Sequence, residues 1–339
     1  MSKPPWEFPL WGPIFSPIGA LYGAFMTMRR RRFASGASPQ HRFAVPVISV
    51  GNLTVGGVGK TPMVAKILTL LESQDGKCVL SRGYGAQVAE SGLNDESHML
   101  QQQFPDTMFV QGKDRVAAAL KQAKEAQVFI LDDGAQHLRI NRDLEILVFD
   151  TASLSGPRFT LPAGPWRENL LAAASADFLF LSRSDEVDEE TRLRATKVLS
   201  GLFPDKPVFE TKHETVGLSD AYGNEMPLES LRGHSVLAVS AIGKPVSFAT
   251  SLERLGADVI GRLEFRDHAP FGPAERQRII QSRCDLGAEF LVTTEKDVAK
   301  IMVDFPSEDA ERLRVLRVEL DLGAGEEPIK DALRDLGLI

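Results

Sequence analysis

Val47-Ile-Ser-Val-Gly-Asn-Leu-Thr-Val-Gly-Gly-Val-Gly-Lys-Thr61 begins as an apolar strand, continues as a glycine-rich loop, and is followed by a helical pattern. Glycines in such a loop let backbone N–H groups turn inward around phosphate oxygens, and the helix N-terminus adds positive partial charge. The lysine reaches the β- and γ-phosphates, and the next hydroxyl binds Mg²⁺. We therefore expect a nucleotide to be bound by Thr54, Val55, Gly56, Gly57, Val58, Gly59, Lys60 and Thr61.

A second apolar run ends in two carboxylates, Asp132 and Asp133. In proteins with a phosphate loop, an acid at such a strand end holds the metal, directly or through water. Asp132, Asp133 and Thr61 are therefore candidate Mg²⁺ ligands. A glycine then permits a turn, and we expect Gln136 and His137 to face the same crevice as substrate contacts. The alternative is that the acids only terminate the strand.

Apolar runs alternate with helical patterns after Pro46, which predicts an α/β fold with a P-loop NTPase-like parallel sheet. The expected strands are residues 45–50, 78–80, 128–131, 146–149 and 178–181, and then 235–239, 258–262, 290–293 and 315–319. The expected helices include residues 63–71, 115–124, 245–255, 274–286 and 329–336. We expect an interface segment at 1–45, a P-loop domain at 46–205, a linker at 206–230 and a smaller α/β domain at 231–339.

Charge is divided unevenly along the chain. The net charge of −7 does not favour nucleic-acid binding, and we expect no nucleic-acid partner. Residues 1–45 nevertheless carry +5, because six basic residues stand against Glu7 alone, so the remainder carries −12. A basic head on an acidic body indicates that the head meets an anionic surface.

The basic head contains an aromatic helical pattern followed at once by Arg29, Arg30, Arg31 and Arg32. Its apolar residues recur with helical spacing as Trp11, Ile14, Phe15, Ile18, Leu21, Tyr22, Phe25 and Met26. Prolines interrupt the segment, so we expect no transmembrane span, and the charge follows the apolar stretch, unlike in a signal peptide. We expect an amphipathic helix at a membrane interface, with its arginines on lipid phosphates. The alternative is a helix docked on the protein's own core.

Seven motifs together resemble one family, the tetraacyldisaccharide 4′-kinases of lipid A biosynthesis. Asp132-Asp-Gly-Ala-Gln-His137 resembles the family's DDGFQH box, and Gly51-Asn-Leu-Thr-Val-Gly-Gly-Val-Gly-Lys-Thr-Pro62 resembles its nucleotide loop. The other five are Ser81-Arg-Gly-Tyr-Gly85, Leu161-Pro-Ala-Gly-Pro-Trp-Arg-Glu168, Ala241-Ile-Gly-Lys-Pro245, Asp267-His268 and Thr293-Thr-Glu-Lys-Asp297. The likeness runs from the N-terminal aromatic helix to near the C-terminus.

The resemblance implies two α/β lobes around a cleft, with the phosphate loop in the larger N-terminal lobe. It implies a reaction in which ATP, with Mg²⁺, phosphorylates the 4′-hydroxyl of a tetraacylated glucosamine disaccharide 1-phosphate. Because this acceptor is a membrane lipid, we expect a peripheral protein on the cytoplasmic face of a bacterial inner membrane. We expect it to be a monomer.

The resemblance also implies a catalytic pair. Asp95 matches the aspartate of the family's Asp-Glu pair and is the candidate base for the acceptor hydroxyl. His268 matches the histidine that pairs with this aspartate, and an imidazole orients a carboxylate and shares its charge. Without the resemblance, His268 reads as an ordinary surface histidine.

Further charged residues match the family's motifs. Glu96 and Glu168 are candidate metal or acceptor contacts. Arg115 and Arg167 are candidates for stabilising charge on the γ-phosphate or for binding the lipid 1-phosphate, because a guanidinium matches phosphate oxygens. Residues 293–297 end a strand where contacts to adenine or ribose are expected.

Some positions depart from these patterns. Thr54 stands where the strict phosphate loop has glycine, Ala135 where the family has phenylalanine, and Asn169 where proline is common. These departures concern local packing more than chemistry.

Two other functions fit parts of the sequence. One is a membrane-associated P-loop ATPase switch of the partitioning or metal-insertion kind, but such proteins carry a lysine where this chain has Val55. The other is a soluble small-molecule kinase, for which the aromatic and basic head has no purpose.

Overall fold

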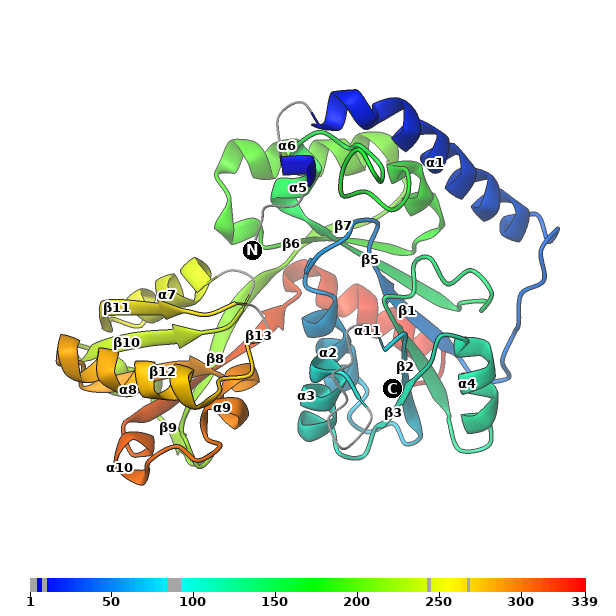
Figure 1. Ribbon diagram of the computed structural model, residues 1–339. Helices are drawn as coiled ribbons and strands as arrows, with labels where there is room; N and C mark the ends of the chain where they lie inside the picture. Colours follow the sequence, from blue (N-terminus) through cyan, green and yellow to red (C-terminus); the bar gives the residue numbers. More distant parts are fainter. Residues whose placement is uncertain (1–4, 8–10, 84–92, 243–244, 267–268) are drawn as a thin grey trace. The chain divides into compact units, whose positions relative to one another are not determined.

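The computed structural model describes residues 5–7, 11–83, 93–242, 245–266 and 269–339. The chain forms two compact units, of which one comprises Met1–Lys212 with Leu320–Ile339 and the other His213–Glu319. Each unit has a sheet of its own with helices packed on it (Figure 1). The predicted α/β class is therefore confirmed.

A seven-stranded sheet forms the centre of the first unit, with its strands in the order β3-β2-β4-β1-β5-β6-β7. Every neighbouring pair is parallel. The strands are β1 (Val47–Gly51), β2 (Lys77–Ser81), β3 (Met108–Gln111), β4 (Val128–Asp132), β5 (Leu144–Asp150), β6 (Phe178–Ser182) and β7 (Val208–Glu210). The helices are α1 (Trp11–Ala34), α2 (Lys60–Leu70), α3 (Asp95–Gln103), α4 (Arg115–Gln122), α5 (Thr151–Ser155), α6 (Glu189–Leu202) and α11 (Glu326–Asp335), with short turns η1 (Pro5–Glu7), η2 (Leu170–Ser175), η3 (Ser184–Glu186) and η5 (Gly323–Gly325).

The apolar runs account for this sheet, because parallel strands covered on both faces are apolar throughout. Every residue of β1, β2 and β5 is buried. The strands of a parallel sheet all end at one edge, and β1 lies between β4 and β5. Val50 of β1 pairs in register with Asp132 of β4, so the loops that follow these two strands start side by side.

The second unit has a six-stranded sheet in the order β11-β10-β12-β13-β8-β9. The strands are β8 (Lys212–Asp220), β9 (Glu225–Met226), β10 (Ser235–Ser240), β11 (Asp258–Glu264), β12 (Phe290–Thr294) and β13 (Leu313–Asp321). The helices are α7 (Pro245–Arg254), α8 (Pro273–Leu286), α9 (Glu295–Ile301) and α10 (Ser307–Ala310), with the turn η4 (Leu228–Leu231). Side chains of β10 alternate between two cores, with Leu237 on one face and Val236 and Ala238 on the other.

The units divide the chain differently from the expected domains. Residues 206–230, expected as a linker, contain β7, β8 and β9, and exposed residues alternate with partly buried ones along most of β8. This polar outer face made the segment resemble a linker. The C-terminal helix α11 was expected in the second domain, but Ile329 and Leu333 are buried in the core of the first unit. The chain therefore returns to the first unit after β13.

Helix α1 docks on its own unit through glycines. Gly12, Gly19 and Gly23 are buried on one side of this 24-residue helix. A Cβ on Gly19 would lie 2.7 Å from the Thr160 carbonyl oxygen, so the helix approaches the segment 159–164 more closely than a larger residue permits. Docking on the protein's own core, the alternative to membrane contact, is therefore present on this side.

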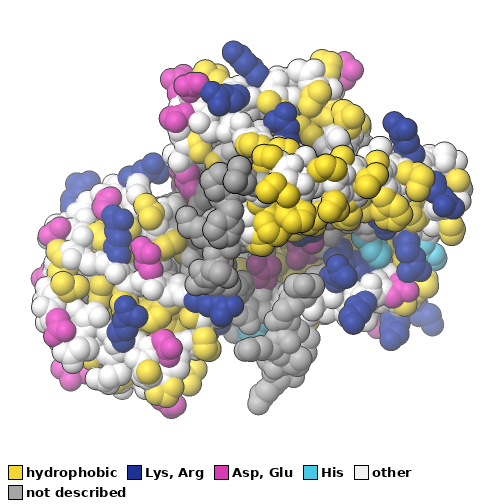
Figure 2. Space-filling view, turned by 45° about the horizontal axis from the view of Figure 1, so that its top comes forward, with side chains coloured by type: hydrophobic (Ala, Val, Ile, Leu, Met, Phe, Trp, Pro, Cys, Tyr) yellow, Lys and Arg dark blue, Asp and Glu magenta, His cyan; other side chains and the backbone are white. Residues whose placement is uncertain are grey.

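The other side of α1 is an apolar stripe exposed to solvent. Its residues are between 52% and 74% exposed, and they are Ile14, Ile18, Leu21, Phe25 and Met28. Figure 2 shows apolar side chains gathered along α1, with basic side chains near one end. Within the described part of the chain, no helix is long and apolar enough to span a bilayer. Contact between this stripe and a membrane remains a prediction.

Candidate active site

The phosphate loop, residues 54–61, connects β1 to α2. Gly59 caps α2 in a left-handed conformation with φ of 89°, and Gly56 has φ of 103°. Residues other than glycine rarely adopt such backbone φ angles, which explains why glycine occupies both positions. A Cβ on Gly56 would meet no atom within 4 Å, so this part of the loop is open to a ligand. From β6, Ser182 Oγ donates to the Val58 carbonyl at 2.8 Å and fixes the other side of the loop.

Asp133 contacts three of the basic residues predicted to belong to the site. Its Oδ1 lies 3.5 Å from Lys60 Nζ, and its Oδ2 lies 2.7 Å from Arg167 Nη1. The buried Arg115 donates from Nη1 to the Asp133 carbonyl oxygen at 3.0 Å. Burial acts to raise the pKa of the Asp133 carboxyl, but Lys60 and Arg167 hold the pKa below its ordinary value. Asp133 is therefore an ionised link between the loop and the two arginines.

Asp132 has the opposite electrostatic surroundings. Burial raises the pKa of its carboxyl to about 6, and the negative charges of Glu96 and Asp133 act in the same direction. Lys60 and Arg115 only partly offset them. The structure thus brings Glu96, from α3, near the acid pair at the end of β4.

Gln136 and His137 lie in the turn that follows the acid pair. Gln136 Nε2 donates to the Asn52 carbonyl at 2.9 Å, and Gln136 Oε1 accepts from Arg167 Nη1 at 3.1 Å. Burial and then the charge of Arg115 lower the pKa of His137 to about 4, so the ring is neutral at neutral pH. Its Nε2 is buried and makes no hydrogen bond to a described residue. A contact between this nitrogen and a substrate group stays a prediction.

Glu168 has a partner that the sequence did not indicate. The buried Glu168 carboxylate accepts hydrogen bonds from Arg30 Nε at 2.9 Å and from Arg30 Nη2 at 3.0 Å. The same guanidinium donates to the Ala135 carbonyl at 2.8 Å, and Arg29 Nη1 donates to the Gln136 carbonyl at 3.1 Å. Two arginines expected on lipid phosphates therefore bind the turn that carries Gln136, and no local sequence signal marks this pairing.

A Mg²⁺ ion fits the acid pair. Asp133 Oδ1 is buried and accepts no hydrogen bond from a described residue. Burial raises the pKa of Asp132 most, and the negative charges of Glu96 and Asp133, which a cation would offset, raise it further. Mg²⁺ is commonly held by one or two carboxylates together with phosphate and water oxygens. Among the described residues, no group of three His, Cys, Asp or Glu side chains is placed to hold a metal. A metal at this place would therefore share its ligands with the nucleotide.

Some predicted residues lie outside this description. Asp95 begins α3, but its side chain is outside the described residues, as is all of His268. Residues 84–85, 243–244 and 267 of the quoted motifs are outside them as well. The predicted pairing of Asp95 with His268 therefore stays a prediction. Residues 293–297 span the end of β12 and the start of α9, within the second unit.

The model of the LpxK family, described as tetraacyldisaccharide-1-P 4′-kinase, matches residues 11–337. The chain belongs to this family. A tetraacyldisaccharide 4′-kinase of Anaeromyxobacter sp. (strain K) is 33% identical, over 94% of this chain and 91% of the relative. One of Pelobacter propionicus is 36% identical with the same coverage.

A solved structure of a family member has the same fold. The structure, described as an "apo" form of LpxK from Aquifex aeolicus in complex with ATP, has a TM-score of 0.74 and 28% sequence identity. The match covers 96% of this chain and 99% of that chain. The family is one of kinases, so this chain is a phosphotransferase that acts on a hydroxyl group. The alternative of a P-loop ATPase switch is not favoured.

Proposed function

We propose that this chain transfers the γ-phosphate of ATP to the 4′-hydroxyl of a tetraacylated glucosamine disaccharide 1-phosphate, in the biosynthesis of lipid A. The observation that carries the proposal is the link from Lys60 through Asp133 to Arg167, beside an open phosphate loop. Cations on opposite sides of one carboxylate are arranged to neutralise a phosphoryl group in transfer. The family match supports the acceptor.

The loop and the acid pair would share the nucleotide and the metal. Backbone N–H groups of residues 56–61 and the Lys60 ammonium would bind the β- and γ-phosphates. The Thr61 hydroxyl and Asp132 would ligate Mg²⁺, with Asp133 or Glu96 completing the protein's share. When bound, Mg²⁺ neutralises charge on the phosphates. Glu168, which already accepts two hydrogen bonds from Arg30, is a weaker candidate for a metal ligand than the sequence indicated.

Proton transfer needs a base near the acceptor hydroxyl. Asp95 begins α3, next in sequence to Glu96, whose charge acts on Asp132. This position supports Asp95 as the base, with His268 as its partner in the family pattern. The neutral His137 and Gln136 would bind polar groups of the sugar, and Arg115 and Arg167 would stabilise the γ-phosphate or bind the 1-phosphate.

A lipid acceptor requires access from a membrane. The stripe on α1 is apolar, and Arg31 and Arg32 at its basic end are exposed to solvent. The segment 159–168 lies between this helix and the phosphate loop, since Thr160 Oγ1 donates to the Gly19 carbonyl and Arg167 N donates to the Leu53 carbonyl at 2.7 Å. We therefore place the protein peripherally on the cytoplasmic face of the bacterial inner membrane, where ATP is available. A monomeric state remains an expectation.

A radiolabel transfer assay tests this proposal. The purified full chain is mixed with γ-labelled ATP, Mg²⁺ and one of three acceptors, namely the tetraacylated disaccharide 1-phosphate, its de-acylated form, or a water-soluble sugar. With the parent chain, we expect label in the tetraacylated lipid. With the Lys60→Ala variant, we expect no labelled lipid. ATP hydrolysis at full rate without any acceptor would contradict the proposal and would favour an ATPase switch.

A further inference from the structure

The first turn of α3 carries two of the predicted site residues. Asp95 is the first residue of this helix and Glu96 the second, and the charge of Glu96 acts on Asp132. The first backbone N–H groups of a helix have no partner within the helix, and a helix end frays when they find none elsewhere. Whatever fixes the first turn of α3 therefore also fixes the backbone that carries these two acids.

Asn94 caps this turn. Its backbone is extended, with φ of −73° and ψ of 165°, and its Oδ1 accepts from Ser97 N at 2.9 Å. Asparagine is among the residues preferred at such a position. In a capping box, a glutamate or glutamine three residues after the cap accepts from the cap's own backbone N–H, but here the short Ser97 holds that position. The backbone N–H of Asn94 therefore needs an acceptor from elsewhere in the fold.

Gln111, the last residue of β3, supplies that acceptor. Its Oε1 accepts from Asn94 N at 3.2 Å, while its Nε2 donates to Asn94 Oδ1 and to Ser97 Oγ, both at 2.9 Å. One carboxamide thus makes three hydrogen bonds to the start of α3. A Cβ on Gly83 would lie 3.1 Å from Gln111 Oε1, so a glycine at that position leaves space for the carboxamide. We call Asn94, Ser97 and Gln111 the amide clamp.

The amide clamp is anchored on the first sheet. Gln111 pairs in register with Ser81 at the end of β2, and the Ser81 carbonyl accepts from Gly112 N at 3.1 Å. The hydroxyl oxygens of Ser81 and Ser97 lie 3.4 Å apart, and both residues are buried. β2 lies next to β4, which ends at Asp132. The amide clamp therefore ties the first turn of α3 to the sheet edge that carries the acid pair.

We propose that Gln111 is a positioning residue for phosphate transfer, because the amide clamp holds the turn that carries Asp95 and Glu96. This inference rests on the proposed function and adds to it a residue that lies outside the seven motifs. Gln111 acts through the backbone of α3. A displacement of about 1 Å at a helix end misplaces the groups that it carries, and such a displacement can lower a reaction rate about 10²-fold. ATP affinity should not change, because the phosphate loop lies between β1 and α2.

Three substitutions test the amide clamp. Gln111→Leu keeps the approximate size of the side chain and removes all three hydrogen bonds of its carboxamide. Asn94→Ala removes the acceptor shared by Ser97 N and Gln111 Nε2. Asn94→Asp is the conservative variant, since a carboxylate oxygen can accept both bonds and aspartate caps helices as well as asparagine does. We expect the first two variants to lower kcat roughly 10- to 100-fold and to keep the KM for ATP within about twofold, while Asn94→Asp keeps a near-parental kcat.

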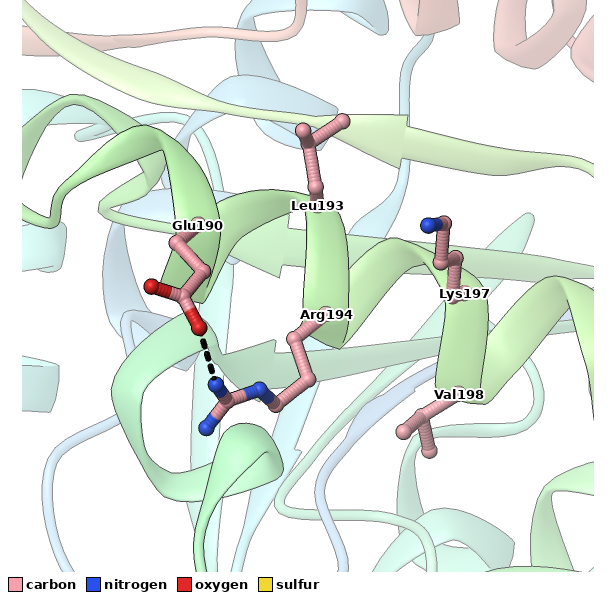
Figure 3. A pocket seen from close by; sticks show the side chains of 5 residues that line it. All are labelled: Glu190, Leu193, Arg194, Lys197 and Val198. Carbon is pink, nitrogen blue, oxygen red and sulfur yellow. Dashed lines mark hydrogen bonds and ion pairs between the residues drawn. The ribbon is translucent and has the colours of Figure 1, made fainter.

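Two substitutions elsewhere are matched controls. Gln127→Leu makes the same change at the opposite edge of the first sheet, where Gln127 precedes β4 and its Oε1 accepts from another glutamine at 3.0 Å. Asp188→Ala removes an equivalent cap, since Asp188 Oδ1 accepts from a backbone N–H in the first turn of α6 at 2.7 Å. Figure 3 shows the following turns of α6, where the exposed Glu190 and Arg194 pair with each other. Asp188→Ala should lose about as much thermal stability as Asn94→Ala, and both controls should keep the parental kcat.

A double variant, Asp95→Ala with Gln111→Leu, gives the decisive readout. If Gln111 acts through the first turn of α3, its loss should cost much less once Asp95 is gone, so the two effects on kcat should not be additive. Thermal unfolding sets an assay temperature at which every variant is folded, and the partly exposed Asn94 carries the test should Gln111→Leu fold poorly.

Three results would overturn the inference. They are a parental kcat in Gln111→Leu or, where that variant folds poorly, in Asn94→Ala, additive effects in the double variant, and an equal loss of kcat in Asp188→Ala. A parent chain that transfers no phosphate to the lipid, or near-parental turnover of Asp95→Ala, would count against the proposed function instead.

Discussion

Arg30 and Glu168 form a buried ion pair that connects the N-terminal helix to the predicted site. Two hydrogen bonds join them, from Nε to Oε2 at 2.9 Å and from Nη2 to Oε1 at 3.0 Å, across 138 positions of sequence. The guanidinium also donates to the Ala135 carbonyl. The end of α1 is thus fixed to the turn between Asp133 and Gln136. A displacement of α1 would therefore act on the predicted site residues through direct contacts.

Removing one partner of this pair should destabilise the protein. Arg30→Met leaves the Glu168 carboxylate, only 2% exposed, without its cation, which costs about 3–5 kcal/mol. Urea unfolding measures this loss. The neighbouring Arg31→Met, at an exposed position, should change the free energy of unfolding by less than about 0.5 kcal/mol. Equal effects of the two substitutions would show that the pair has no special role.

The pKa of Asp132 predicts a pH dependence. Because the folded-state pKa is raised to about 6, the stabilising contribution of this group is fully present below the ordinary value of 3.8 and is lost as pH rises through about 6. Asp132→Asn cannot ionise, so without metal it should be more stable than the parent above pH 6 and similar at pH 4. Unfolding midpoints in EDTA measure the difference. A difference that is the same at both pH values would contradict the assigned pKa.

The apolar stripe of α1 predicts membrane binding. Leu21→Asp and Phe25→Asp place charge at positions that are 74% and 55% exposed, so the fold should tolerate them. Each should lower co-sedimentation with vesicles of anionic phospholipid, because burying a charge at the interface is unfavourable. Val303→Asp, at an equally exposed position in the second unit, is the control. Vesicle binding that survives both α1 substitutions would remove the membrane role of this stripe.

If Asp95 is the base, its removal should affect phosphate transfer but not ATP binding. Asp95→Ala should lower the rate of phosphate transfer roughly 10²- to 10⁴-fold, the usual contribution of a general base. Its affinity for ATP should be nearly unchanged, since Asp95 is not part of the phosphate loop. Initial rates and ATP titrations measure the two effects. A variant with near-parental turnover would exclude Asp95 as the base.

The sequence predicted the parts of this site that have a local signature. Glycine spacing identified the phosphate loop, and the strand-ending carboxylates identified Asp132 and Asp133. Every predicted strand has its ends within about two residues of those of an observed strand, because buried parallel strands are continuous apolar runs.

Contacts between distant segments had no such signature. The partner of Glu168 is Arg30 of α1, and the sequence alone is equally consistent with the arginines of this helix binding lipid phosphates. The role of Asp133 as a link depends on the register of β1 and β4, which brings Lys60 beside it. The return of α11 to the first unit depends on packing of Ile329 against the sheet, which no local pattern reveals. The residue pairs that matter most for the mechanism were therefore the least predictable.

A crystal structure with ATP and Mg²⁺ bound tests the central claim most directly. The account predicts that the β- and γ-phosphates lie within the loop of residues 56–61, with Lys60 Nζ on a phosphate oxygen and the metal beside Asp132. Triphosphate bound elsewhere, or a loop closed by its own side chains under saturating ATP, would contradict it.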